Sequence, residues 1–251
     1  MWPLDCTGAT APRQAKHRPG KGLSRPGAAH PRGGWPARET RIVPVMTAVF
    51  PAPVVLFITG PAACGKSTLA REWVRYCLQH GDPWTLIDKD LVGGQHGPRI
   101  LELMGADPND RDSPLFKQEV RDLDYRATLQ LAAEQLRLGG SVALPGPWTR
   151  ELVDGLLEDP VALGLPPVPS VVVWLSLSDA ERRRRVEQRG NPLDRWKLRH
   201  WAAYAKGSRD GAPPDCHGPA PVVLDAVLPL ARQLAAIEAL VRDKRKTAAP
   251  R

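Results

Sequence analysis

The sequence feature that most constrains this chain is the segment from Gly60 to Thr68, which reads Gly-Pro-Ala-Ala-Cys-Gly-Lys-Ser-Thr. It fits the phosphate-binding pattern of Gly, four residues and then Gly-Lys-Ser/Thr. Residues 54–58 before it are a short β-branched and aromatic run that predicts a buried strand, and residues 67–80 after it carry apolar side chains at helical spacing. Because the pattern lies between a strand and a helix, it predicts a nucleotide-binding loop and not a chance match in a turn.

Each position of this loop has a physical task. Glycines at 60 and 65 let backbone N–H groups turn inward around an anion, and the helix that follows adds the positive end of its dipole. We expect Lys66 to reach the β- and γ-phosphates and the Ser67 hydroxyl to hold Mg²⁺. The predicted nucleotide-binding residues are Gly60, Ala62, Ala63, Cys64, Gly65, Lys66, Ser67 and Thr68.

The charge of the chain is concentrated at its two ends. The formal net charge is +8, of which residues 1–45 carry +6 and residues 242–251 carry +4, so residues 46–241 carry −2. Nucleic-acid binding would therefore depend on the terminal segments alone, and we expect no nucleic-acid partner for the body of the chain. No apolar run approaches the roughly 18 residues of a membrane span. The four cysteines lack Cys-x-x-Cys spacing, which fits a reducing, cytoplasmic location.

The predicted domain organisation has one folded unit with flanking ends. Residues 1–45 hold seven prolines and six glycines with few aliphatic side chains, so they cannot bury enough surface to offset the entropy of ordering. We predict a disordered leader there, or alternatively a true translation start at Met46. The frequent Pro and Gly argue against an amphipathic targeting helix. A single α/β domain is expected over 46–246, with a flexible tail over 247–251.

Short apolar segments alternate with helical patterns along this domain. A helix is expected from Ser113–Pro114 to the Gly139-Gly140 stop, and two more are expected from Ser178 through Tyr204. Residues 91–111 are expected to form a loop and a short helix over the site. This alternation predicts a parallel sheet with right-handed crossovers. The predicted strands are 54–58, 84–87, 141–144, 171–175 and 222–224.

Two carboxylates, Asp88 and Asp90, follow the second predicted strand. The carboxyl ends of strands form the crevice in which open α/β sheets bind ligands. Strands three and four end in Pro145 and Ser176, so they lack the acidic residue that a switch or motor ATPase usually carries there. A kinase needs a base to orient and deprotonate an attacking hydroxyl. We expect Asp88 or Asp90 to act as this base, although a solvated turn with Asp90 as a helix cap is the alternative.

An arginine cluster follows the fourth predicted strand. Consecutive helical residues point about 100° apart, so no more than one or two of Arg182 to Arg185 can face phosphates. Arg189 and Arg195 flank a Gly-Asn-Pro turn and are better placed in a lid that closes on ATP and stabilises transferred charge. A basic, solvated helical hairpin is the alternative interpretation.

With the phosphate loop, the Asp-x-Asp after strand two and the Arg-rich hairpin after strand four, residues 54–225 resemble the P-loop small-molecule kinases, the grouping that includes chloramphenicol phosphotransferase and zeta toxin. The resemblance implies the three-layer P-loop NTPase fold, a five-stranded parallel sheet in the order 2-3-1-4-5 with a helical lid, and ATP with Mg²⁺ as cofactors. It implies Asp88 as the base, with Asp90 as the other candidate. Ser67 and Asp90 are the expected metal ligands. The lid arginine maps to Arg189 or Arg195. One departure is Pro145, where relatives often carry a carboxylate.

The predicted activity is transfer of the γ-phosphate of ATP to a hydroxyl group of a small molecule, such as an antibiotic, a sugar, a nucleoside or a nucleotide sugar. The competing interpretations are a nucleotide-binding regulator or toxin-like protein, and a nucleic-acid-linked ATPase. The chain is expected to be a monomer or a dimer. An acceptor pocket could be lined by Arg121, Asp124, Tyr125, Trp148 and Arg150, although packing and surface solvation explain these residues nearly as well.

Overall fold

The computed structural model describes residues 51–206 and 209–248. The predicted leader over 1–45 and the alternative start at Met46 lie outside these residues. Of the predicted tail, residues 247 and 248 belong to the last helix, and the rest lies outside the described part. Among the described residues, no helix is both long enough and apolar enough to cross a membrane.

All five strands form one parallel sheet in the order β2-β3-β1-β4-β5, as the resemblance implied. The central strand β1 pairs with β3 on one side and with β4 on the other, so it has a neighbouring strand on both sides. Its side chains are all buried, which explains the uninterrupted apolar sequence. The strands are β1 (Val55–Thr59), β2 (Trp84–Leu86), β3 (Ser141–Pro145), β4 (Ser170–Ser176) and β5 (Val222–Asp225).

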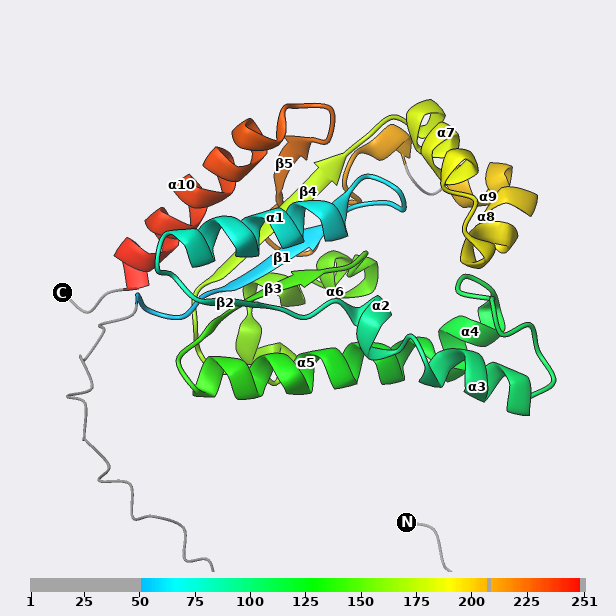
Figure 1. Ribbon diagram of the computed structural model, residues 1–251, viewed down its shortest axis with the longest axis horizontal. Coiled ribbons are helices and arrows are strands. Elements are labelled where there is room, and N and C mark those ends of the chain that lie inside the picture. The colour runs from blue at the N-terminus through cyan, green and yellow to red at the C-terminus, as the bar shows by residue number, and fades with distance from the viewer. Residues whose placement is uncertain (1–50, 207–208, 249–251) are drawn as a thin grey trace, which may run out of the picture. The chain divides into compact units, whose positions relative to one another are not determined.

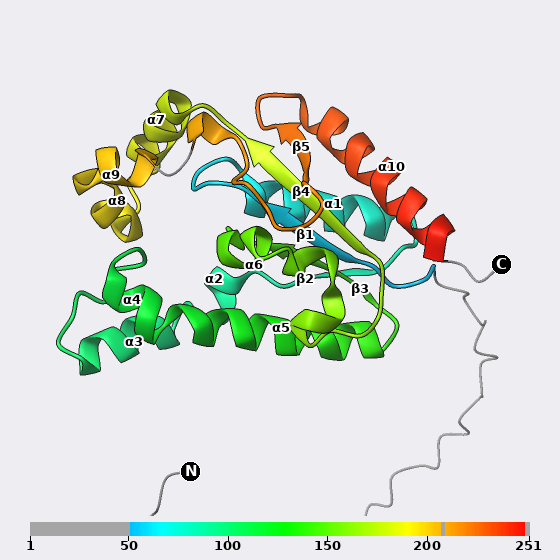
Figure 2. The same ribbon diagram turned by 180° about the vertical axis from the view of Figure 1, so that it is seen from behind.

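Helices cover both faces of the sheet and complete three layers (Figures 1 and 2). Side chains alternate along β1, so Leu56 and Ile58 pack with helices α1 (Lys66–Gln79) and α10 (Leu230–Ala248). Val55 and Phe57 point the other way, into the core beneath α5 (Arg121–Arg137) and α6 (Thr149–Val153). The predicted three-layer α/β fold is therefore confirmed.

The helix predicted from Ser113 to Gly139 is interrupted at Val120. Helix α4 spans Pro114–Glu119, and Val120, with φ −116°, separates it from α5. The Val120 side chain is fully buried with Leu101 and Phe116 in a small satellite core. The chain bends here because this cluster draws α4 onto α3 (His96–Leu103).

Two helical groups stand at the carboxyl end of the sheet. After β2 come α2 (Lys89–Val92), α3 and α4; after β4 come α7 (Asp179–Arg189), α8 (Arg195–Arg199) and α9 (Trp201–Lys206). Figures 1 and 2 show the two groups facing each other at the same end of the sheet. An ion pair joins them: Lys197 Nζ on α8 lies 2.7 Å from Asp112 Oδ2, in the segment between α3 and α4. The remaining short helices are η1 (Leu156–Glu158), η2 (Pro160–Leu163), η3 (Pro192–Asp194) and η4 (Arg209–Gly211).

Candidate nucleotide-binding and catalytic site

The phosphate loop turns sharply between β1 and α1. Gly60 and Gly65 have φ angles of 131° and 102°, and Ala63, which is not a glycine, has φ 63°. A Cβ on Gly60 would lie 2.6 Å from the Leu175 carbonyl oxygen of β4, so the strand packs too closely for any side chain. Helix α1 begins at Lys66 without a side-chain cap. Its first backbone N–H groups therefore remain available to an anion at the positive end of the helix dipole.

Lys66 is held within its own loop. Its Nζ donates a hydrogen bond to the Pro61 carbonyl oxygen at 2.6 Å and lies 3.8 Å from Cys64 Sγ. Burial lowers the pKa of Lys66, although Cys64 and the negative charge of Asp90 act in the opposite direction. Among the described residues, no carboxylate lies within ion-pair distance of this ammonium group. An incoming phosphate would supply the missing negative charge.

Asp88 is the carboxylate that reaches the phosphate loop. Ser67 Oγ donates to Asp88 Oδ2 at 2.7 Å, and the other carboxylate oxygen accepts from the Asp90 N–H at 3.0 Å, which caps α2. Asp88 is only 4% exposed. Asp90 is exposed and pairs with Lys89. Partial loss of hydration acts to raise the pKa of Asp90, but the charges of Lys89 and Lys66 outweigh it and hold that pKa below its usual value. The structure thus brings Asp88, and not Asp90, beside Ser67.

The oxygen atoms of Ser67 and Asp88 fit a magnesium ion. Mg²⁺ prefers oxygen ligands and is usually bound through one or two carboxylates, substrate phosphates and waters. The described residues contain no cluster of three or more His, Cys, Asp or Glu side chains suited to a metal. The remaining ligands of an ion at Ser67 and Asp88 would therefore come from a nucleotide and from water.

Arg182 is the member of the arginine cluster that reaches the phosphate loop. Its side chain is fully buried, and its Nε donates to the Ala62 carbonyl oxygen at 3.4 Å. The guanidinium lies over the rings of Trp201 and Tyr204, at 5.7 and 5.5 Å from their centroids. The Tyr204 hydroxyl accepts from the Ala62 N–H at 3.4 Å. Helices α7 to α9, which we call the lid helices, therefore contact the loop through Arg182 and Tyr204; the sequence analysis named Arg182 only as a member of its cluster and gave Tyr204 no role.

The two arginines predicted to contact phosphates lie elsewhere on the lid. Arg189 donates two hydrogen bonds to Asp194 Oδ2, at 2.9 and 2.6 Å, and Asp194 is almost fully buried. Arg195 is exposed, and it forms no ion pair within the described part of the chain. Arg183 and Arg184 are exposed and paired with nearby glutamates, which agrees with the expectation that most of the cluster is solvated.

Lys197 is a further cation that sequence analysis missed. Besides its contact with Asp112, its Nζ lies 3.3 Å from Asp194 Oδ1. Burial acts to lower the pKa of Lys197, but Asp112, Tyr204 and Asp194 outweigh it and raise that pKa. The charge of Lys197 also contributes to lowering the pKa of Lys66. The lid thus places a second ammonium group within electrostatic reach of the phosphate loop.

Most of the residues considered for an acceptor pocket serve packing instead. Tyr125 and Trp148 are buried in the core beneath the sheet. Arg121 Nη2 contacts both oxygens of Glu151 at 2.9 and 3.0 Å, and the Arg150 guanidinium binds both oxygens of Asp122. These pairs brace α5 against α6. Two of these residues also contact the α2 segment: Asp124 lies against Gly93, and Lys89 Nζ lies 5.6 Å from the centroid of the Tyr125 ring.

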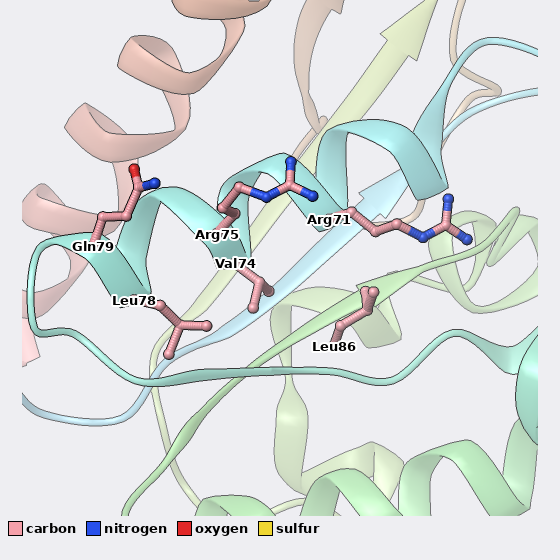
Figure 3. A pocket seen from close by; sticks show the side chains of 6 residues that line it. All are labelled: Arg71, Val74, Arg75, Leu78, Gln79 and Leu86. Atoms are coloured by element: carbon pink, nitrogen blue, oxygen red, sulfur yellow. The ribbon is translucent and has the colours of Figure 1, made fainter.

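Two surface hollows lie along the later turns of α1, away from the phosphate loop. One, of about 470 Å³, lies between α1 and the edge strand β2 (Figure 3). The other, of about 540 Å³, includes Trp73, Tyr76 and Val241 where α1 meets α10. Neither hollow includes a residue of the Ser67 and Asp88 site. The residues that line the first are Arg71, Val74, Arg75, Leu78, Gln79 and Leu86.

Comparison with known proteins identifies the family. No curated protein sequence matches this chain significantly. A solved structure of an assumed kinase from Chloroflexus aurantiacus superposes with a TM-score of 0.52 at 16% identity, covering 77% of this chain and 98% of that one. The APS kinase of Mycobacterium tuberculosis, solved with AMPPNP and APS, has a TM-score of 0.47 at 18% identity, covering 76% of this chain and 99% of that one. At these identities the first likeness shows a shared fold. A family model described as an AAA domain matches residues 55–207, which is more than half of the chain. The chain therefore belongs to the AAA domain family.

Proposed function

We propose that this protein is an ATP-dependent phosphotransferase that moves the γ-phosphate of ATP to a hydroxyl group of a small molecule. The observation that carries the proposal is the 2.7 Å contact between Ser67 of the phosphate loop and Asp88 after β2. The acidic group of the site therefore comes from the strand at the sheet edge, on the side of α2 to α4. A second substrate could approach the phosphate loop from that side. The fold shared with an assumed kinase is consistent with this proposal.

The residues of the loop and the lid would bind and orient the nucleotide. Backbone N–H groups at the start of α1 would hold the β- and γ-phosphates, and Lys66 would exchange its bond to Pro61 for a phosphate oxygen. Arg182 is paired with Asp179, and Lys197 with Asp112 and Asp194, so each would exchange a carboxylate for a phosphate oxygen to add positive charge at the nucleotide. Ser67 and Asp88 would hold Mg²⁺, which when bound neutralises charge on the phosphate oxygens.

We assign the two carboxylates after β2 differently from the sequence-based expectation. Asp88 is buried and bonded to Ser67, which suits a metal ligand. Asp90 is exposed, and the charges of Lys89 and Lys66 hold it ionised, which suits a group that orients an acceptor hydroxyl by accepting its hydrogen bond. Asp90→Asn should lower kcat while leaving the Mg²⁺ dependence unchanged, whereas Asp88→Asn should shift the Mg²⁺ dependence.

The experiment that tests the function is an ATP-consumption screen over hydroxyl-bearing metabolites, sugars, nucleosides and antibiotics. The Lys66→Ala protein is the blank, because it retains the fold but lacks the phosphate-binding ammonium. Acceptor-dependent ATP consumption by the wild type alone would support the kinase. Tight ATP binding without turnover of any acceptor would favour the nucleotide-binding regulator, and equal ATP affinity in both proteins would refute the site.

A further inference from the structure

The side chain of Arg111, in the segment between α3 and α4, lacks a hydrogen-bonding acceptor. It is only 15% exposed, and its nearest carboxylate oxygen, Asp124 Oδ2, lies 3.8 Å from Nη1, beyond hydrogen-bond distance. Its guanidinium carbon lies 5.4 Å from the centroid of the Phe116 ring. Within the described part of the chain no other contact of its five N–H donors is formed. Arg111 is half-buried, and its unpaired N–H groups are not enclosed by the protein, so they are accessible to an acceptor from outside the chain.

Two glycines make room for Arg111 and Asp124. A Cβ on Gly97 would lie 2.5 Å from Arg111 Nη1, and a Cβ on Gly93 would lie 2.0 Å from Asp124 Oδ1. Neither glycine has a positive φ, so space and not backbone conformation requires them. Any larger residue at either position would displace the charged group that it cradles. The guanidinium therefore occupies a defined place against α3.

Arg111 lies next to the residue that contacts the lid helices. The next residue, Asp112, forms the ion pair with Lys197 of α8. Asp124, the carboxylate nearest to Arg111, lies against Gly93, three residues after Asp90. Arg111 is therefore on the same side of the site as Asp90. If Asp90 orients the acceptor hydroxyl, then Arg111 lies beside the acceptor.

We propose that Arg111 is a specificity-determining residue that binds an oxyanion of the acceptor, so that the acceptor carries a carboxylate, phosphate or sulfate group in addition to its hydroxyl. This inference rests on the proposed kinase function. The planar fork of a guanidinium suits bidentate contact with such a group. Asp124 holds the guanidinium in place only loosely, at 3.8 Å, and competes with the incoming anion for it.

A binding experiment tests the site without ATP turnover. Sulfate is titrated by calorimetry into the full-length Lys66→Ala protein, whose phosphate loop keeps its backbone N–H groups but binds anions more weakly, and the contribution of Arg111 is the difference between matched variants. Adding Arg111→Gln should weaken sulfate binding about 10- to 100-fold, as expected for the loss of a charge-assisted contact. Adding Asp124→Asn should tighten it, because the competing carboxylate is neutralised. The matched control is Arg99→Gln, an exposed arginine of α3 paired with Glu102, which should leave sulfate binding unchanged.

Gly97→Ala provides a second variant if Arg111→Gln does not fold. It keeps every charge but places a methyl group where Nη1 lies, so it should also weaken sulfate binding. The inference is overturned if Arg111→Gln and Arg99→Gln bind sulfate equally well, or if Asp124→Asn fails to tighten binding. If Arg111 and Asp124 formed only a structural ion pair, Asp124→Asn would not tighten sulfate binding.

A kinetic experiment then tests the acceptor. Neutral and anionic members of matched pairs, such as a sugar and its sugar acid or a nucleoside and its 5′-monophosphate, are compared as acceptors. Arg111→Gln should raise KM at least tenfold for the anionic member and leave the neutral member unchanged. Preference of the wild type for the neutral members would overturn the inference. Absence of turnover with every acceptor would instead count against the kinase function, and the sulfate titration would still decide the role of Arg111.

Discussion

Replacement of Asp88 separates its structural role from its chemical role. The carboxylate accepts the Asp90 N–H at 3.0 Å and the Ser67 hydroxyl at 2.7 Å. In Asp88→Asn the amide oxygen can still accept from the Asp90 N–H, and the amide nitrogen can donate to Ser67 Oγ. Asparagine is also as good a helix cap as aspartate. This variant therefore removes one negative charge and keeps both hydrogen bonds.

Asp88→Ala removes the charge and both hydrogen bonds. Loss of a helix cap costs about 1 kcal/mol, and loss of the bond from Ser67 costs roughly 1 kcal/mol more, because the half-buried hydroxyl can turn to water. We expect the free energy of unfolding of Asp88→Ala to be about 2 kcal/mol lower than that of the wild type. This loss lowers Tm by about 4 to 8 °C for a domain of this size. Asp88→Asn should melt within about 2 °C of the wild type.

Both variants should lose activity to a similar extent, since neither retains the charge that would hold Mg²⁺. Thermal melting followed by circular dichroism gives the stabilities, and ATP consumption titrated with Mg²⁺ gives the activities. Equal destabilisation of the two variants would show that Asp88 does not cap α2 in solution. An unchanged Mg²⁺ dependence in Asp88→Asn would refute its role as a metal ligand.

Three further changes test the loop and the lid. Lys66→Met should melt at or above the temperature of the wild type without nucleotide. Burial lowers the pKa of Lys66, so the stability of the wild type should rise with pH between that lowered pKa and 10.5. The variant should lack this rise, and melting temperatures of the two proteins that change in parallel with pH would disprove the prediction. Asp194→Ala leaves Arg189 and Lys197 without their shared carboxylate. Helices α7 to α9 should therefore lose about 2 kcal/mol of local stability, and their amide hydrogens should exchange faster; unchanged exchange would contradict this. Arg182→Met should weaken ATP binding by about tenfold, measured by calorimetry, while equal affinity would exclude a role for Arg182 at the loop.

The sheet could be predicted from the sequence because its strands carry their own signal. Strands β1 and β4 are buried on both faces, so residues 54–58 and 171–175 are continuously apolar and their positions were predicted to within a residue or two. The turn chemistry at Gly60 to Ser67 is equally local. These features depend on the residues of one short segment and not on distant contacts.

The interruption at Val120 and the shape of the acceptor side could not be predicted in this way. Residues 114–137 keep a helical period throughout, and the break follows from contact of Phe116 and Val120 with Leu101. Likewise, Gly93 and Gly97 look like loop glycines in the sequence. Only the approach of Asp124 and Arg111 shows that they provide space.

The selection of Arg182 from its cluster required the position of β4 relative to β1. The two strands pair with Thr59 opposite Trp174, so the helix that follows β4 starts beside the phosphate loop that follows β1. Ser178 caps this helix, and the first arginine after the cap therefore reaches Ala62, 120 residues earlier in the chain. Adjacent strand order and a cap position together would have identified Arg182.

The same geometry determines which lid cations remain for a nucleotide. Arg189 is bound to Asp194, a carboxylate only five residues later, so its charge is already compensated before any phosphate arrives. Arg195 is exposed and without an ion pair among the described residues. Lys197 is shared between Asp112 and Asp194, and it lies close enough to lower the pKa of Lys66. A phosphate bound at Lys66 would relieve this repulsion, so nucleotide binding should strengthen the association of α8 with the phosphate loop.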